Sequence, residues 1–231
     1  MMNCEKFTGK AEAYAKARPT YAAEAIDHIC SLVKPDAVFA DIGAGTGKFT
    51  FQIAQRGYKV FAVEPNSDMR SQLNHSVESG KNVTVVSASA EFTTLDDQSV
   101  DVITCAQALH WIDPVAFRKE CVRIGKRDCL VIALYNSSRS GDHDDHRKDA
   151  VNKFFSKPQI ITFSNPVSYN REGWLAYMNS HSHSPLPSDL SYELHIEAMN
   201  EIFDREQVGG LISRDIVTTL YVERIDSIIE L

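Results

Sequence analysis

The sequence predicts a doubly wound α/β fold, in which helices cover both faces of a mostly parallel sheet. Along the first 140 residues, short β-branched and apolar runs alternate with longer amphipathic stretches, which is typical of strand–helix units around such a sheet. The short runs are largely apolar at successive positions, as strands buried on both faces require. The first run leads directly into a cluster of glycines and then a helix, and this turn carries most of the functional information.

Composition excludes several classes of protein. The chain has 231 residues, 43% apolar and 24% charged, which suits a folded protein with a sizeable core. Its formal charge of −7 would repel a phosphate backbone on average, so nucleic acid is not an expected partner. No apolar run approaches the roughly 18 residues that cross a bilayer, and residues 1–10 carry charges where a signal peptide would be apolar. The five scattered cysteines indicate reduced thiols without a zinc site, so we expect a cytoplasmic protein.

The elements of the first 140 residues follow from local patterns. Residues 10–33 have helical spacing broken by Pro19, and because proline restricts the residue before it, two helices with a corner are expected. The apolar runs then predict strands at 38–42, 59–63, 83–87, 100–104 and 129–134. The amphipathic stretches between them predict helices near 47–56, 67–79 and 114–126.

Beyond the fifth strand the chain becomes more polar. Residues 136–149 should form a long exposed loop that opens a helix. The later elements are expected in the order strand 159–163, helix 170–179, helix 189–208 and strand 212–222. Gly209 and Gly210 should end the last helix. Because this tail shows no core pattern of its own, we expect it to complete the same sheet, with its helices forming a cap.

The glycine turn predicts a ligand site. It reads Asp41-Ile-Gly43-Ala-Gly45-Thr-Gly47 after the first strand. Glycines let the backbone turn tightly and approach a ligand without a Cβ in the way. The following helix offers unpaired N–H groups at its start. A nucleotide-like ligand is therefore expected at the carboxyl end of the first strand.

Spacing separates the candidate ligands. A dinucleotide fingerprint would need glycine at Lys48, and a phosphate-binding Walker loop would need Ser or Thr at Phe49. The remaining pattern, D-x-G-x-G-x-G from Asp41, resembles motif I of the class I S-adenosylmethionine (SAM) dependent methyltransferases. In that family the loop passes under the methionine part of the cofactor, and an acid at Asp41 suits a sulfonium with a free ammonium. The alternative is a glycine-rich turn in some other α/β domain.

Later positions extend the resemblance. Glu64 follows the second strand, where a carboxylate can accept hydrogen bonds from both ribose hydroxyls; an exposed strand cap is its alternative. Met69 fits the family's apolar contact with adenine, with helix core as its alternative. The turn SASAEF places Ala90 and Glu91 where the family reaches the adenine edge, or simply exposes a glutamate. The fourth strand ends in AQALHW, which would put Gln107 beside the cofactor.

Methyl transfer needs little chemistry from the protein. It is an in-line displacement, so the enzyme mainly positions the nucleophile and excludes water. A general base helps only if the acceptor is a hydroxyl or a carbon acid. His110 is the candidate base because it lies just past a strand end, although it could instead fix the loop. Trp111 is a candidate substrate contact or a packing residue. No G-x-S-x-G elbow supports a hydrolase.

The amino-terminal segment resembles a lid. Its Y-x-x-x-R-P-x-Y pattern is similar to the lid helix of small-molecule methyltransferases of the methyltransferase domain 11-like subgroup. Tyr14 and Arg18 share a helix face and could close over the cofactor carboxylate and the acceptor, with Tyr21 toward the substrate; a solvated amphipathic helix is the alternative. The run from His143 to His146 is interpreted as a solvated loop rather than a metal site.

Taken together, the resemblance implies a methyltransferase acting on a small molecule, with a Rossmann-like seven-stranded sheet in the order 3-2-1-4-5-7-6. A single domain over 1–231 is expected, with lid helices at 1–34, the cofactor core at 35–140 and a substrate cap with the last strands at 141–231. The implied cofactor-binding residues are Asp41, Gly43, Ala44, Gly45, Gly47, Glu64, Pro65, Met69, Ala90, Glu91, Gln107, Tyr14 and Arg18. The alternatives are a SAM-binding protein without methyl transfer, one that uses a modified SAM, or a methyltransferase of a macromolecule. A monomer or homodimer is expected.

Overall fold

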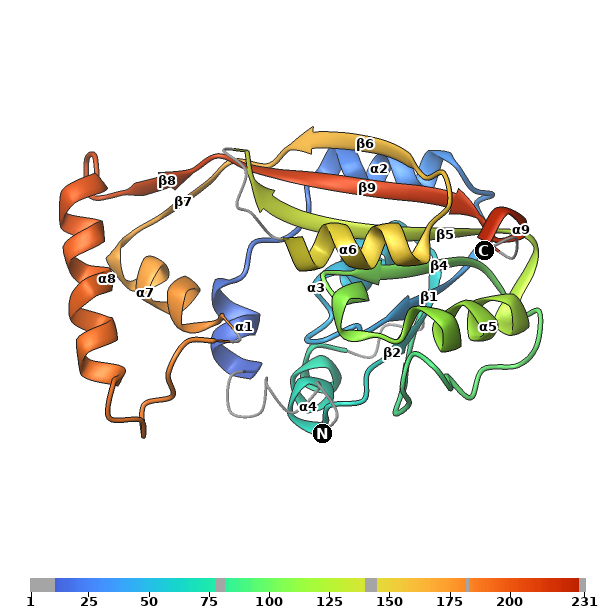
Figure 1. Ribbon diagram of the computed structural model, residues 1–231, viewed down its shortest axis with the longest axis horizontal. Helices are drawn as coiled ribbons and strands as arrows, with labels where there is room; N and C mark the ends of the chain where they lie inside the picture. Colours follow the sequence, from blue (N-terminus) through green and yellow to red (C-terminus); the bar gives the residue numbers. More distant parts are fainter. Residues whose placement is uncertain (1–10, 78–81, 140–144, 182, 229–231) are drawn as a thin grey trace.

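A seven-stranded sheet forms the centre of the molecule (Figure 1). The computed structural model describes residues 11–77, 82–139, 145–181 and 183–228. The strand order is β3-β2-β1-β4-β5-β9-β6, and the strands are β1 Val38–Ile42, β2 Lys59–Val63, β3 Val83–Val86, β4 Val100–Ala106, β5 Gly125–Ser138, β6 Gln159–Ser164 and β9 Ile216–Arg224. The first five are parallel, and β9 is antiparallel to both β5 and β6. Since β6 and β9 are the sixth and seventh strands of this sheet, the expected order 3-2-1-4-5-7-6 is confirmed.

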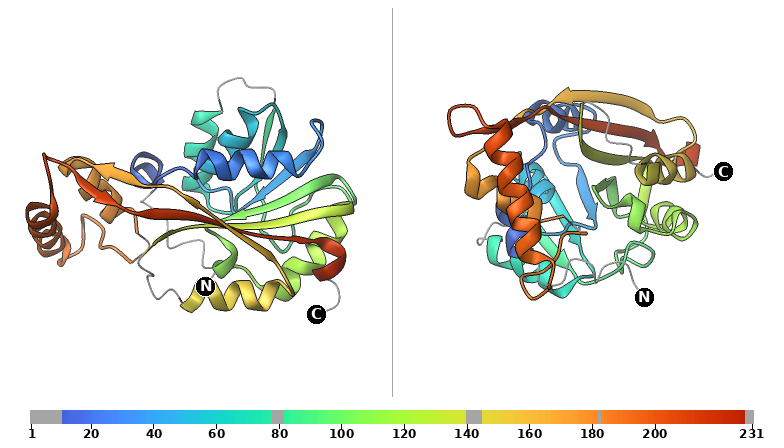
Figure 2. Two further views of the ribbon diagram at one scale, coloured as in Figure 1. Left: turned by 90° about the horizontal axis from the view of Figure 1, so that it is seen from above. Right: turned by 60° about the vertical axis from the view of Figure 1, so that its left-hand side comes forward.

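Helices cover both faces of the sheet. They are α1 Ala11–Ala17, α2 Ala23–Ser31, α3 Lys48–Ala54, α4 Ser67–Ser76, α5 Pro114–Ile124, α6 Asp145–Phe154, α7 Arg171–Asn179, α8 Tyr192–Glu206 and α9 Ile225–Ile228. Figure 2 shows α2 and α3 on one side of the sheet and α5 and α6 on the other. The corner expected at Pro19 is confirmed, because Pro19 lies between α1 and α2. None of the described helices has the length and apolar character that crossing a bilayer requires.

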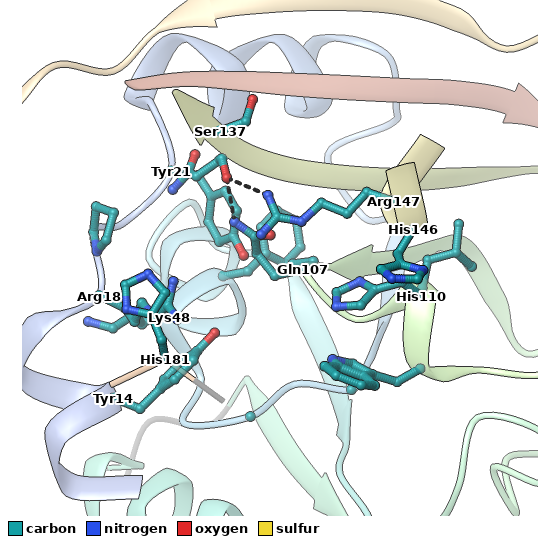
Figure 3. Close-up of a pocket in the computed structure, with 18 of the residues that line it drawn as sticks. Tyr14, Arg18, Tyr21, Lys48, Gln107, His110, Ser137, His146, Arg147 and His181 are labelled. Atoms are coloured by element: carbon teal, nitrogen blue, oxygen red, sulfur yellow. Dashed lines mark hydrogen bonds between the residues drawn. The ribbon is translucent and has the colours of Figure 1, made fainter. Parts of the chain in front are cut away.

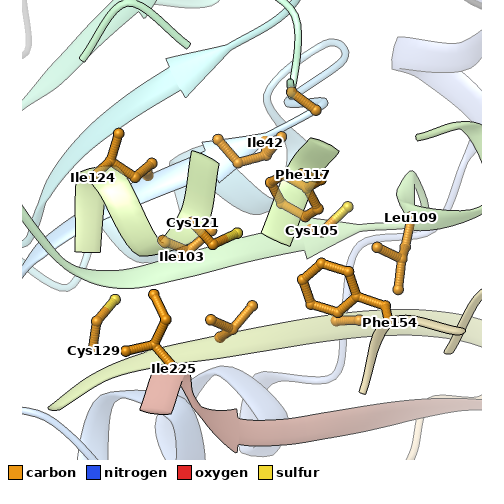
Figure 4. Close-up of a cluster of buried hydrophobic side chains, with 14 of the residues drawn as sticks. Ile42, Ile103, Cys105, Leu109, Phe117, Cys121, Ile124, Cys129, Phe154 and Ile225 are labelled. Carbon is orange, nitrogen blue, oxygen red and sulfur yellow. The ribbon is translucent and has the colours of Figure 1, made fainter. Parts of the chain in front are cut away.

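Successive strand residues face opposite cores, as the two-residue period of a strand dictates. On β1, Phe39 packs with the α2 and α3 side, whereas Ala40 packs with the α5 and α6 side. Figure 4 shows the second core, where Phe117 of α5 and Phe154 of α6 meet β4. The cysteines among the described residues are all free thiols, and three of them lie buried in or beside this core. Both faces of the sheet are therefore covered, as the apolar runs predicted.

The carboxyl-terminal third differs from the expectation. The strand expected at 212–222 is divided: β8 Ile212–Arg214 pairs with β7 Val167–Tyr169 in a separate two-stranded sheet, and β9 begins at Ile216. Trp174, Phe203 and Ile212 form a small buried cluster that joins this ribbon to α7 and α8. The expectation of a tail without a core of its own is therefore wrong. These elements project beyond α1 at one end of the sheet (Figure 1).

Candidate functional site

The glycine turn connects β1 to α3, and its three glycines have φ values of 69°, 57° and 87° at Gly43, Gly45 and Gly47. Packing demands two of them: an added Cβ would lie 2.6 Å from Ala108 Cβ at Gly43 and 2.5 Å from a Leu73 methyl at Gly47. At Gly45 an added Cβ would meet nothing within 4 Å. The backbone there faces open space, as a loop that approaches a ligand should.

Asp41 lies behind this turn and is completely buried. Its carboxylate accepts hydrogen bonds from the hydroxyls of Thr50 at 2.6 Å and Thr104 at 3.3 Å. Burial raises the pKa of Asp41 to about 7 despite these two bonds. Asp41 does not line either of the two cavities described below, so the structure places it in support of the loop and not at the surface of the site.

The smaller cavity, of about 400 Å³, opens beside the turn at the carboxyl ends of β1, β2 and β4. The predicted cofactor residues that line it are Tyr14, Gly43, Gly45, Glu64, Pro65, Met69, Ala90, Glu91 and Gln107. Ala44 lines the neighbouring larger cavity, whereas Gly47 lines neither and serves to pack the turn against α3 and α4. The sequence placed these residues after different strands, and the structure brings them together in the wall of one cavity.

Glu64 is buried and therefore not an exposed strand cap. Its Oε2 accepts a hydrogen bond from the Gly45 amide and its Oε1 one from the Asn66 amide, each at 2.8 Å. Burial raises the pKa of Glu64, and these amide bonds oppose the change. Each carboxylate oxygen has a further lone pair. The side chain can therefore bind the loop and hydroxyl groups of a ligand together.

The larger cavity, of about 990 Å³, shares part of its wall with the smaller one, including Tyr14, Gly45, Gln107 and Trp111 (Figure 3). His110 and Tyr21 line only the larger cavity. The His110 ring centroid lies 4.6 Å from that of Trp111, so the two rings together form an aromatic part of the cavity wall. The imidazole of His110 lies at the cavity surface. Gln107 adopts a positive φ of 59°, and its Nε2 donates to the Asn136 carbonyl at 3.0 Å.

The amino-terminal helix closes over the glycine turn. Arg18 donates through Nη2 to the Ser180 carbonyl at 3.4 Å, and its guanidinium carbon lies 5.5 Å from the ring centroids of both Tyr14 and Tyr177. Lys48 Nζ donates to the Ala15 carbonyl at 2.7 Å, which ties α1 to α3. The structure thus positions Tyr14 and Arg18 together between the turn and α7, as their spacing suggested.

Several lining residues were missed in the sequence. His146 and Arg147 come from α6, and Tyr177 and His181 from α7 and the residues after it. Burial and the nearby Arg18 lower the pKa of His181 to about 4, so its imidazole is neutral at pH 7. His146 belongs to the run that was interpreted as a solvated loop, and the structure instead places it in α6 at the cavity. No local motif marks Arg147 or Tyr177, because only the packing of α6 and α7 around the sheet end brings them to the cavity.

Two buried polar groups at the site can form a hydrogen bond with a ligand. The Thr46 hydroxyl in the glycine turn is buried and has no hydrogen-bond partner among the described residues. The same is true of the Arg18 Nε. Groups of this kind take a hydrogen bond from a bound ligand or from a water molecule. Over the same described part of the chain, no group of His, Cys, Asp and Glu side chains is arranged to hold a metal ion. His143 and Asp144 of the histidine-rich run lie outside the described residues.

Comparisons with known proteins agree with this geometry. Residues 40–133 match a family model described as a methyltransferase domain. The chain is 38% identical over 112 residues to an uncharacterized methyltransferase of Mycobacterium tuberculosis, which covers 48% of this chain and 44% of the relative. It therefore spans about half the length of the curated relatives it matches.

Solved structures show the same fold at low sequence identity. One similar structure is a candidate type II methyltransferase from Anaeromyxobacter dehalogenans. Its TM-score is 0.63 at 18% identity, and the match covers 90% of this chain and 98% of that one. A geranyl diphosphate methyltransferase in complex with SAM is similar at a TM-score of 0.50 and 17% identity, covering 86% and 83%.

Proposed function

The chain carries a class I SAM-dependent methyltransferase domain, and from that premise we propose that the protein transfers the methyl group of SAM to a small-molecule acceptor held in the larger cavity. The observation that supports this most is the pair of adjoining cavities at the carboxyl edge of the sheet. Open α/β folds bind their ligands at this edge. A wall shared through Gly45 and Gln107 would let a group pass from a ligand in one cavity to a ligand in the other.

The smaller cavity is proposed to hold the adenosine part of the cofactor. Glu64 would accept hydrogen bonds from the ribose hydroxyls, while Met69 and the turn at Ala90 and Glu91 would enclose the adenine. The glycine turn, with Tyr14 and Arg18 above it, would hold the methionine part. When bound, SAM supplies an electrophilic methyl group on a sulfonium.

The larger cavity is proposed to hold the acceptor. Its volume of about 990 Å³ lies in the range of sites for metabolites and drug-sized ligands. The packing of α1 against α7 over this edge of the sheet supports a small acceptor over a macromolecular one. Trp111 and Tyr21 would position the acceptor and exclude water, and His110 would take a proton if the accepting group carries one.

We also propose that the chain works as a single domain in the cytoplasm, as a monomer or homodimer. The cofactor cavity draws its residues from the amino-terminal helix and from the core, and the larger cavity adds residues from the carboxyl-terminal cap, which supports one functional unit. The free thiols of the described cysteines suit a reducing compartment.

The test has two stages. S-adenosylhomocysteine (SAH) and SAM should raise the melting temperature, because a ligand that binds only the native state stabilises it, whereas NAD and ATP should not. A screen of small acceptors with SAM should then release SAH. Stabilisation by NAD alone would refute the cofactor assignment. Stabilisation by SAM with no SAH release from any small acceptor would favour a SAM-binding role or a macromolecular acceptor.

A further inference from the structure

A short segment between α1 and α2 is hydrogen-bonded to three places on the sheet. The Thr20 carbonyl accepts hydrogen bonds from Nδ2 of Asn136 at 3.1 Å and from Nδ2 of Asn165 at 2.8 Å. The Ala22 amide donates to the Thr218 hydroxyl at 3.1 Å. Because Asn136 lies in β5, Thr218 in β9 and Asn165 just after β6, the segment that leads out of α1 is fixed to the carboxyl-terminal part of the sheet.

Tyr21, in the middle of this segment, is fixed to α3 as well. Its amide donates to Oε1 of Gln52 at 3.1 Å, and its carbonyl accepts from Nε2 of the same side chain at 2.9 Å. The Tyr21 ring packs edge-on against Phe49, with 5.7 Å between the ring centroids, and lines the larger cavity. The bonds to the segment therefore also place a ring of the proposed acceptor site.

Asn136 links this segment to the wall between the two cavities. Its Oδ1 accepts hydrogen bonds from the Thr218 hydroxyl at 2.6 Å and from Asn165 at 3.3 Å. Its main-chain carbonyl accepts from Nε2 of Gln107 at 3.0 Å and from Arg147 at 3.1 Å, the two bonds that Figure 3 draws as dashed lines. One residue thus binds the α1 connection through its side chain and the cavity wall through its backbone.

Gln107 depends on this support. It lines both cavities, and its φ of 59° is one that residues with a side chain seldom adopt. Such a conformation persists only where the surroundings hold it. Here the Gln107 amide donates to the Leu134 carbonyl at 2.9 Å and the side chain donates to Asn136, so two residues of β5 hold Gln107 at both its backbone and its side chain.

We propose that Asn136 is a positioning residue of the transfer site, which keeps Gln107 and the segment carrying α1 and Tyr21 in one arrangement. This inference rests on the proposed function. Tyr14 of α1 lines both cavities, so α1 must move for a ligand to leave. Without the bonds at Asn136, the closed position of α1 is less well held, and a bound ligand escapes more often.

The test measures the dissociation rate of labelled SAH after addition of excess unlabelled SAH. Asn136→Ala removes the side-chain bonds to the segment and to β9. Thr218→Val removes the hydroxyl between Ala22 and Asn136, and Thr218 itself lines neither cavity. Both variants should release SAH about five times faster than the wild type, since changes in affinity act mostly on dissociation. Hydrogen exchange over α1 with SAH bound should also be faster in both.

Two further variants exclude a general loss of packing. Thr218→Ser keeps the hydroxyl and should dissociate at close to the wild-type rate. Thr219→Val is the matched control, since the Thr219 hydroxyl lies on the same strand, 3.3 Å from that of Thr162, and Thr219 lines neither cavity. It should release SAH at the wild-type rate.

The outcomes separate positioning from simple stabilisation. Melting temperatures that fall in Asn136→Ala and Thr218→Val while SAH dissociation stays at the wild-type rate would overturn the inference. Equal rates in Thr218→Val and Thr218→Ser, or in Thr218→Val and Thr219→Val, would overturn it too. If Asn136→Ala does not fold, the Thr218 pair decides. A wild-type protein that binds no SAH refutes the proposed function instead.

Discussion

The carboxylate of Glu64 bonds directly to the glycine turn: its Oε2 accepts a hydrogen bond from the Gly45 amide at 2.8 Å. The two residues come from the ends of adjacent parallel strands, β2 and β1. The contact therefore orders the loop before any ligand arrives. Because a preformed site loses less entropy on binding, this bond should contribute to affinity as well as to the shape of the turn.

Glu64→Gln should weaken SAH binding by about 1 to 3 kcal/mol, because a charged acceptor of hydrogen bonds becomes a neutral one. Glu64→Ala should weaken it at least as much. The fold should survive both changes, since the side chain lies at a strand end. Calorimetry with SAH gives the affinity, and circular dichroism checks the fold. Unchanged SAH affinity in both variants would restrict Glu64 to a structural role.

Substitutions at Gly43 and Gly45 should distinguish an effect on the free energy of unfolding from an effect on SAH affinity. Gly43→Ala places a Cβ 2.6 Å from Ala108 Cβ and should lower the free energy of unfolding by about 2 to 4 kcal/mol through overpacking and its positive φ. Gly45→Ala meets no protein atom within 4 Å, so it should cost about 1 kcal/mol of stability and yet reduce SAH affinity.

Gly57→Ala is the control for this pair. Gly57 also has a positive φ and open space around an added Cβ, but it lies outside both cavities. Urea unfolding should show a modest loss of stability, as for Gly45→Ala, while SAH affinity stays unchanged. Equal SAH affinities in the Gly45→Ala and Gly57→Ala variants would contradict a ligand at Gly45.

Asp41 should make stability fall as pH rises. Its folded pKa of about 7 lies above its ordinary value near 4, so between these values unfolding releases a proton and the free energy of unfolding decreases with pH. The stabilising contribution is complete below about pH 4 and lost through pH 7. Asp41→Asn should remove this dependence. From pH 4 to pH 8 the free energy of unfolding of the variant should therefore rise relative to that of the wild type, by an amount on the order of a few kcal/mol.

Urea unfolding of both proteins at pH 5 and pH 8 measures the difference. Asp36→Asn, a change at an exposed carboxyl ahead of β1, should leave the pH dependence of the wild type intact. If Asp41→Asn and the wild type lose stability in parallel from pH 5 to pH 8, Asp41 is ionised in the folded protein throughout that range.

The amino-terminal helix should order when the cofactor binds. Tyr14 lines both cavities, and Arg18 donates a hydrogen bond to the Ser180 carbonyl. The segment must therefore open for a ligand to enter or leave, and close again around it. Hydrogen exchange should show new protection over residues 14–21 on addition of SAH, with no change in α5. Identical exchange with and without SAH would argue against a lid.

Local patterns predicted the half of the molecule that carries the glycine turn. Strands β1, β2 and β4 are short and mostly buried runs, and residues such as Gly43 and Glu64 lie at positions fixed by a strand end. The structure therefore reproduces the strand order and gathers these residues into one wall. A direct contact for Asp41 with the cofactor stays a prediction, since the structure places the residue behind the loop.

The rest of the site depends on contacts that sequence patterns do not show. Strand β5 continues to Ser138 although its last residues are polar, because Ser137 pairs with Val217 of β9. Arg147 belongs to a polar helix that looks solvated in the sequence. Only long-range packing brings it opposite Gln107, and the Trp174 cluster arises in the same way from segments far apart in the chain.

The two cavities have different origins along the chain, and this difference bears on how such proteins diversify. Except for Tyr14, the smaller cavity is built within residues 40–133, the range that matches the family model. The cations of the larger cavity, Lys48 aside, come from outside that range. Under the proposed function, substitutions in the terminal segments would change which acceptor is bound while the cofactor site stays the same. In such proteins, substitutions in α6, α7 and the first helices would alter the preferred acceptor during evolution without weakening the binding of SAM.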